Sequence, residues 1–309
     1  MKSTPISLLL FLLTAYTVAS QTVTANKPAD YIYASDGTKL FAKVSGKGPV
    51  CIFVHGGPGM WSKSFEVLKG NNLEKKLSMV YYDQRGSGRS DASVSKNYSI
   101  DRMIEDIEDI RRSLGVEKVY LMSHSFGGII AANYAKKFPE HLNGLILLNS
   151  TLCVNNSIEG QIKYINGLLN TNFTITNSNE IFPVFSKAKN KLSEKGLEYT
   201  LLSESKKTVA LLDSIDREKP NNNDFGRNVW KIEEYIHDFR PMTAAISIPV
   251  LVITGKKDYA IGVDHYKLFE FPNQKTVRID GGHVLYYERN KEFTQAVFSF
   301  IESQQIQNK

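Results

Sequence analysis

A serine, an aspartate and a histidine that together could carry acyl-transfer chemistry occur in this sequence in that order. Ser125 lies in Ser-His-Ser-Phe-Gly-Gly, Asp258 in Thr-Gly-Lys-Lys-Asp, and His283 in Gly-Gly-His. A serine hydroxyl becomes a nucleophile when a histidine accepts its proton and a carboxylate holds that histidine in one tautomer. The order serine, acid, histidine is typical of a nucleophile on a strand-to-helix turn. We predict that Ser125, Asp258 and His283 are the nucleophile, acid and base of a serine hydrolase.

The residues around Ser125 favour a sharp turn. The apolar run 119–122 predicts a buried strand, and 127–138 predicts a helix directly after the turn. Such a turn lifts the nucleophile above the sheet, and its usual pattern is Gly-x-Ser-x-Gly. Here Ser123 occupies the first glycine position. A serine that only caps the following helix is the structural alternative.

A second glycine-rich segment, His-Gly-Gly-Pro-Gly at 55–59, follows the apolar run 50–54. Glycines let the backbone approach a reacting carbonyl closely and aim N–H groups at its oxygen. We predict that the N–H groups of Gly57 and Phe126 form an oxyanion hole. A purely structural turn is the alternative, and we expect His55 to order this loop.

Other strand-end residues have simpler expected roles. Asp83, in Asp-Gln-Arg-Gly-Ser-Gly, is expected to form an ion pair or order its loop. Asn149 stands after the strand 145–148 at the alternative position for the acid, which supports Asp258. The remaining histidines are expected to lie outside the catalytic site, and His265 is expected on a surface helix.

The elements that must position these residues alternate between strands and helices. Short apolar runs of strand character alternate with segments of helical spacing, which predicts an α/β fold with a mainly parallel sheet. The predicted strands are 31–34, 39–44, 50–54, 79–82, 119–122, 145–148, 249–254 and 276–279. The predicted helices are 64–77, 100–114, 127–138 and 291–301.

This alternation stops at residue 152, and residues 152–240 are polar, lysine-rich and helical in pattern. We therefore predict a core built from 21–151 and 241–309, interrupted by a helical cap at 152–240. Residues 1–20 have a positive Lys2, a short apolar run and small residues at 18–20, which is typical of a secretory signal peptide. An uncleaved anchor is the alternative. The expected product is exported, periplasmic or secreted, with no stable membrane insertion after cleavage.

Composition excludes several classes of protein. The 309 residues carry a formal net charge of +6, and the excess of Lys and Arg is spread along the chain. A nucleic-acid surface needs clustered charge, so we expect no nucleic-acid partner. We expect no disulfide, because Cys51 and Cys153 fall near opposite ends of predicted parallel strands. No zinc-ligand spacing occurs, so no metal is predicted.

Five segments in order resemble one family: 55–59, Asp-Gln-Arg-Gly-Ser-Gly-Arg-Ser at 83–90, 123–128, 254–258 and 281–283. The chain resembles the α/β-hydrolase fold and, within it, the prolyl iminopeptidase-like serine peptidases. The resemblance implies an eight-stranded, mainly parallel sheet with helices on both faces, an inserted helical cap, and hydrolysis without a cofactor.

The resemblance also implies how a substrate would be bound. Iminopeptidases bind the ammonium group of an N-terminal proline with cap carboxylates. Asp224, in Asn-Asn-Asp-Phe, takes the place of one such acid, and Tyr259 stands where the family often has a second. Glu233 or Glu234 could substitute for the missing acid. These similarities make Asp224 and Tyr259 the predicted substrate-binding residues.

Three functions follow as hypotheses. The first is an aminopeptidase that releases proline or another small residue from peptides. The second is a carboxylesterase for small acyl esters, and the third is a catalytically silent binding protein on a hydrolase scaffold. Dehalogenases and epoxide hydrolases of this fold need an aspartate where Ser125 stands. The expected partner is a small peptide or ester, and the sequence predicts no oligomeric state.

Overall fold

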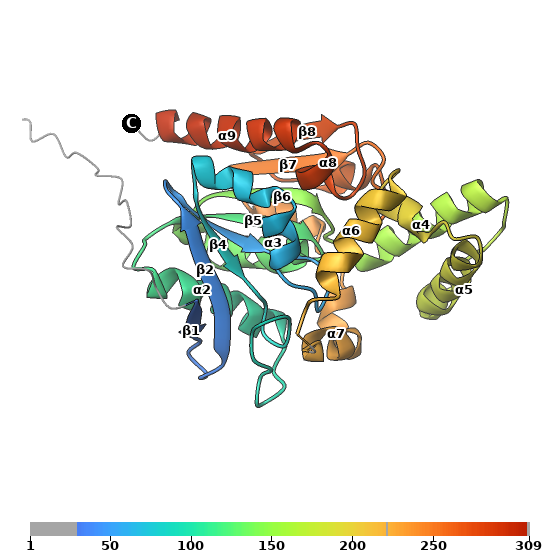
Figure 1. Ribbon diagram of the computed structural model, residues 1–309, viewed down its shortest axis with the longest axis horizontal. Helices are drawn as coiled ribbons and strands as arrows, with labels where there is room; N and C mark the ends of the chain where they lie inside the picture. Colours follow the sequence, from blue (N-terminus) through green and yellow to red (C-terminus); the bar gives the residue numbers. More distant parts are fainter. Residues whose placement is uncertain (1–29, 221, 308–309) are drawn as a thin grey trace, which may run out of the picture.

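The computed structural model describes residues 30–220 and 222–307. The predicted signal peptide at 1–20 lies outside the described residues. The framework is one sheet with strand order β1-β2-β4-β3-β5-β6-β7-β8 (Figure 1). β1 pairs antiparallel with β2, and β2 with β4, whereas all later pairs are parallel. The predicted eight-stranded, mainly parallel sheet is confirmed. Its strands are β1 Tyr31–Tyr33, β2 Lys39–Gly46, β3 Val50–Val54, β4 Ser78–Tyr82, β5 Val119–Ser125, β6 Leu142–Ser150, β7 Val250–Gly255 and β8 Gln274–Ile279.

The central strands are largely apolar, as expected when both faces of a sheet are covered. In β3 every residue is buried, and alternate side chains enter two separate cores. Val50, Ile52 and Val54 pack on the side of α2 (Ile100–Ser113) and α3 (Gly127–Lys137), whereas Cys51 and Phe53 pack on the side of α1 (Lys63–Val67) and α9 (Asn290–Gln307). The sheet is therefore the middle layer of three.

One predicted helix is two. The prediction of a single helix over 64–77 is wrong: the chain forms α1 and then the 3-10 helix η1 (Gly70–Lys75). Lys69 between them has φ +68°, a left-handed conformation that ends a helix. The turn between α1 and η1 brings Gly70 against Phe65, since a Cβ on Gly70 would lie 2.5 Å from the Phe65 ring. The Phe65 ring is itself held in the core, where it stacks on Phe53 at 3.8 Å between centroids.

Between β6 and β7 all elements are helical. They are α4 Val154–Leu169, η3 Ser178–Glu180, α5 Ile181–Glu194, η4 Glu198–Leu201, α6 Lys206–Asp216, α7 Asp224–Asn228, η5 Val229–Lys231, η6 Glu233–Ile236 and η7 Pro241–Ala245. In Figure 1, α4 and α5 extend to one side beyond the sheet. The short 3-10 helix η2 (Pro139–His141) precedes β6. After β7 come η8 (His265–Leu268), β8, α8 (Leu285–Glu288) and α9. We call the helices from α4 to η6 the insertion.

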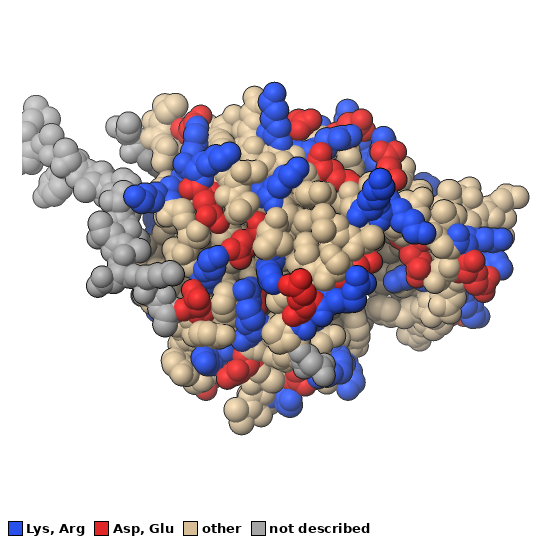
Figure 2. All heavy atoms as spheres, viewed as in Figure 1, with Lys and Arg blue, Asp and Glu red and all other residues tan. Residues whose placement is uncertain are grey.

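Three further features concern the surface charge, the cysteines and the length of the apolar helices. Figure 2 shows acidic and basic side chains interspersed over the visible face of the molecule. Cys51 and Cys153 are both buried and free. Among the helices of residues 30–220 and 222–307, none has the length and apolar character needed to cross a bilayer.

Candidate active site

Ser125 is the last residue of β5 and lies directly before Phe126 and α3. Its φ is +56°, the left-handed backbone of a sharp strand-to-helix turn. Two glycines make the turn possible. A Cβ on Gly56 would lie 2.7 Å from the Ser125 Cβ, and one on Gly127 would lie 2.4 Å from the Val54 carbonyl oxygen. Any other residue at 56 or 127 would therefore push the two strand ends apart.

Asp258 and His283 meet although they come from different loops. Asp258 follows β7 and His283 follows β8, so neighbouring parallel strands bring them to the same edge of the sheet. His283 Nδ1 lies 3.0 Å from both Asp258 carboxylate oxygens, and both residues are buried. Because a carboxylate accepts, Nδ1 carries the proton, which leaves Nε2 free to accept one.

A cavity of about 810 Å³ joins the predicted residues. Ser125, His283, Gly57 and Phe126 all line it, and Asp258 lies behind His283. In the part of the chain that the structure describes, neither the Gly57 nor the Phe126 N–H enters a turn or loop hydrogen bond. Within the described residues, a serine, a histidine held by an acid, and two residues with such unpaired backbone N–H groups therefore border one space, which is the set of groups that acyl transfer requires.

His55 fixes the glycine-rich loop through hydrogen bonds on both ring nitrogens. Its Nε2 accepts the Gln84 N–H at 2.9 Å, so Nδ1 carries the proton and donates to the Gly56 carbonyl at 2.8 Å. Burial lowers the pKa of His55, which keeps the ring neutral. His55 therefore orders the loop, as predicted.

Asp83 serves the neighbouring loop. Its carboxylate accepts from the Ser62 N–H at 2.8 Å and pairs with Arg89 Nε at 2.7 Å. Burial alone would raise the pKa of Asp83, but the hydrogen bonds and charge of Arg89 outweigh it and lower the pKa. The predicted ion pair and loop-ordering role are confirmed.

Asp224 is not brought together with Ser125. It lies at the start of α7, outside the cavity lining, where it pairs with Lys96 Nζ at 2.8 Å and accepts from the Tyr98 hydroxyl. These hydrogen bonds, with the Lys96 charge, lower the pKa of Asp224. Glu234, one of the two residues expected to substitute for the missing second acid, also has a structural partner, since it accepts the Ile100 N–H at 2.7 Å where α2 begins.

Tyr259 is likewise not among the residues that line the cavity with Ser125. Its ring stacks on Tyr164 of α4 at 3.8 Å between centroids and 13° between planes. Both rings line a second cavity, on a different face of α4 from the residues that line the first. The resemblance to the iminopeptidases did not predict this stacking, because the position of Tyr259 depends on a partner in the insertion.

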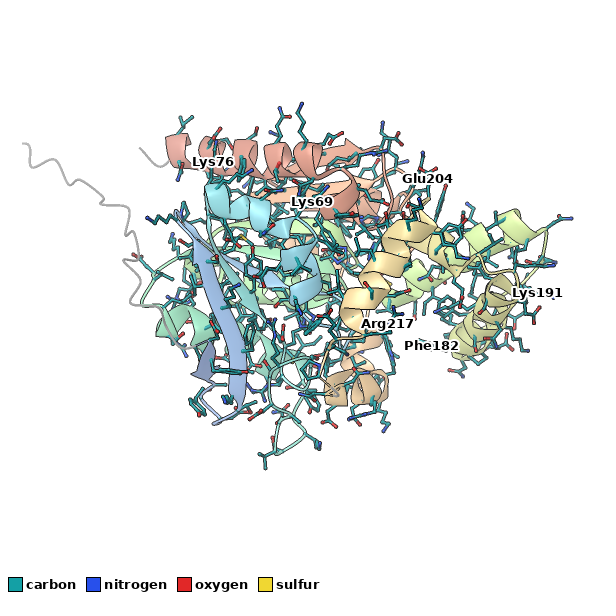
Figure 3. The ribbon with its side chains drawn as sticks, in the orientation of Figure 1. Lys69, Lys76, Phe182, Lys191, Glu204 and Arg217 are labelled. Atoms are coloured by element: carbon teal, nitrogen blue, oxygen red, sulfur yellow. The ribbon has the colours of Figure 1, made fainter. Side chains whose placement is uncertain are left out.

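The structure reveals polar cavity residues that the sequence did not single out. Two carboxylates and two lysines of the insertion line the cavity, among Phe182, Phe185 and Trp230: Glu198, Asp213, Lys189 and Lys206. Figure 3 shows Phe182 on the side of α5 that faces the rest of the insertion, and Lys191 on the opposite side. The four charged residues lie in helical, surface-like patterns, so no local signal distinguished them.

His265 corrects another expectation. It is buried rather than on a surface helix, and its Nδ1 lies 2.7 Å from the Gly262 carbonyl oxygen. Burial lowers its pKa. Among residues 30–220 and 222–307, no cluster of three His, Cys, Asp or Glu side chains could hold a metal ion.

Residues 49–290 match the family model described as the alpha/beta hydrolase fold. The chain belongs to this family. A proline iminopeptidase from Thermoplasma volcanium is 39% identical over 30% of this chain and 32% of its own length. Proline iminopeptidase PfmaB from Pestalotiopsis fici is 27% identical over 86% of this chain and 97% of its own length.

A solved structure agrees with this assignment of the fold. The proline iminopeptidase-related protein from Thermus thermophilus superimposes with a TM-score of 0.73 at 21% identity, covering 89% of this chain and 96% of that one. In several of the matched iminopeptidase sequences the similarity spans about a third of the relative, as it does in the Thermoplasma volcanium enzyme. At these levels the family and the fold are shown.

Proposed function

We propose that this alpha/beta hydrolase is a serine hydrolase that acts as an aminopeptidase on short peptides. The observation that carries the proposal is the Asp258–His283 pair at 3.0 Å, with His283, Ser125 and the N–H groups of Gly57 and Phe126 on one cavity. We assign Ser125 as nucleophile, His283 as base and Asp258 as the acid that orients it.

The first half of the reaction acylates Ser125. Its Oγ bonds to the substrate carbonyl carbon while its proton passes to His283 Nε2, and the carbonyl electron pair moves onto oxygen. The Gly57 and Phe126 N–H groups bind this oxyanion, and Asp258 stabilises the imidazolium. Collapse of the intermediate breaks the bond to the leaving group, which takes the proton from His283.

The second half releases the acyl group. Water bonds to the acyl carbon as His283 accepts one of its protons. The new intermediate collapses, the bond to Ser125 Oγ breaks, and Oγ regains its proton from His283. The free acid leaves and the enzyme is restored, so the reaction consumes one water and no other reactant.

The choice of peptides over esters is supported by two carboxylates on the cavity lining. A peptide with a free N-terminus brings an ammonium group, and Glu198 and Asp213 can pair with it, although Lys189 and Lys206 on the same lining balance their formal charge. Asp224 is already paired with Lys96, so we assign ammonium binding to the two cavity acids instead. The iminopeptidase relatives support the same choice.

The experiment compares kcat/KM for a proline arylamide with a free amine, its N-acetylated form and p-nitrophenyl butyrate. Ser125→Ala is the blank and should lower kcat by about 10⁴–10⁶-fold. A strong preference for the free amine supports the aminopeptidase. Wild-type turnover in Ser125→Ala would overturn the nucleophile.

A carboxylesterase is the second candidate, favoured by the aromatic lining contributed by Phe182, Phe185 and Trp230. An apolar pocket binds a small acyl chain without needing an ammonium group. Rapid butyrate hydrolysis with no preference for the free amine would select this function. Absence of both hydrolysis and labelling by a fluorophosphonate would select the silent binding protein. We further infer export, from the signal-peptide pattern of residues 1–20.

A further inference from the structure

The backbone around His283 is held from three directions. The Gly282 carbonyl accepts from Asn149 Nδ2 at 2.8 Å, and the His283 carbonyl from His124 Nε2 at 3.0 Å. The His283 N–H donates to the Leu202 carbonyl at 2.7 Å. These partners come from β6, from the turn that carries Ser125, and from the insertion. Both peptide units that flank the His283 side chain are therefore fixed.

Asn149 differs from the other two because it also holds the segment that carries the acid. Its Oδ1 accepts the Gly255 N–H at 3.2 Å, three residues before Asp258. One amide thus joins the end of β7 to the loop after β8. The two segments are already in contact, since a Cβ on Gly255 would lie 2.4 Å from the Gly282 carbonyl oxygen.

The chemistry of the side chain fits this double contact. The Gly255 N–H needs an acceptor and the Gly282 carbonyl needs a donor, and an amide supplies both. A carboxylate would supply only acceptors and would face the Gly282 carbonyl oxygen. Asn149 is fully buried and has φ +43°, a conformation that asparagine tolerates better than most residues.

We propose that Asn149 is a positioning residue that sets the relative placement of Asp258 and His283. The inference rests on the proposed function, because it concerns the acid and base assigned there. Asn149 does not line the cavity with Ser125, so it acts through Gly255 and Gly282 and not on the substrate. A catalytic pair must be held within about 0.5 Å of its productive geometry, and this amide spans the two loops that carry it.

The test removes the amide without straining the backbone. Asn149→Gly keeps the positive φ, which glycine adopts freely. Asn170→Gly is the matched control, because Asn170 has φ +52° at the end of α4, outside the cavity lining. We would measure kcat and KM on the better of the arylamide and butyrate substrates, and the rate at which a fluorophosphonate labels Ser125.

For Asn149→Gly we expect kcat and the labelling rate to fall by about 10–100-fold, with KM within about threefold, as for loss of a group that orients a site. Asn170→Gly should match the wild type. Asn149→Ala also removes the amide, so it should lose as much, and it serves if the glycine variant does not fold.

Two results would overturn the inference. One is wild-type kcat and labelling in folded Asn149→Gly or Asn149→Ala. The other is a loss expressed mainly in KM, which would place Asn149 in substrate binding. A wild-type chain inert toward both substrates and the probe would instead overturn the proposed function, and this inference with it.

Discussion

The loops at the carboxyl ends of the strands and the helices of the insertion line the same cavity, but they hold their polar groups differently. Asp258 and His283 are buried and hydrogen-bonded to each other, and their loops are joined through Asn149. Glu198 and Asp213 are exposed carboxylates on short helices. The groups proposed to carry out the reaction are therefore rigidly held and desolvated. The groups proposed to select the substrate face solvent, so they can change at little structural cost.

The largest expected effect is a loss of kcat on changing the acid in the loop after β7. Asp258→Asn should lower kcat by about 10³–10⁴-fold on peptide and ester substrates alike, because an amide can leave the His283 ring in the wrong tautomer. Asp83→Asn is the matched control: it is an equally buried strand-end acid, and it should act through stability of the loop that Arg89 holds. Steady-state kinetics and denaturant unfolding of both variants check this. An equal loss of kcat in the two variants would contradict the assignment of Asp258.

A smaller effect tests the insertion. Glu198→Gln combined with Asp213→Asn should lower kcat/KM for the free-amine arylamide by up to about tenfold, since two solvent-exposed charge contacts with the ammonium group, each contributing up to about 1 kcal/mol, are lost. Hydrolysis of p-nitrophenyl butyrate should stay within about twofold, because that substrate carries no charge. Kinetics on both substrates measure the difference. If butyrate hydrolysis fell equally, the acids would be supporting the cavity rather than selecting the substrate.

The smallest expected effect is a loss of unfolding free energy in acid. It again distinguishes the loops after the strands from the insertion. Burial and the neighbouring His283 lower the pKa of His124 to about 3. A histidine whose folded pKa is depressed contributes its full stability above its unfolded pKa and loses it as the pH falls toward the folded value. Between pH 7.5 and 5, this should cost up to about 2 kcal/mol of unfolding free energy for one such group.

Urea unfolding at the two pH values measures this cost, and His124→Gln should reduce it. His237→Gln, at an exposed position of the insertion, is the control and should leave the pH dependence unchanged. An unchanged slope in His124→Gln would show that other groups account for the acid sensitivity. His55 and His265, whose pKa values burial also lowers, add to the same loss.

The part of this molecule that the sequence predicts well is the part governed by local signals. The turn at Ser125, the glycine-rich loop and the loops of Asp258 and His283 each follow a buried strand, and parallel strands bring their carboxyl ends to one edge. The order of these motifs along the chain was therefore enough to predict which residues form the site. The break at Lys69 was missed because it depends on the packing of Phe65 against Phe53.

The insertion was predicted as helical but not in its contacts. The ion pair of Asp224 with Lys96 and the stacking of Tyr259 on Tyr164 join segments that are far apart in the chain. Neither pairing leaves a periodic pattern in the sequence. The cavity carboxylates Glu198 and Asp213 look like solvated residues of surface helices, and only the folded arrangement places them near Ser125.

The bond between the His283 N–H and the Leu202 carbonyl has an evolutionary consequence. It joins the insertion to the base through main-chain atoms alone, so no particular side chain at 202 is required to make it. Mutations can therefore replace the residues of the insertion while its attachment to the reaction centre persists. A lineage that keeps this attachment can acquire a new substrate by drift in the insertion, without rebuilding the machinery that cleaves it.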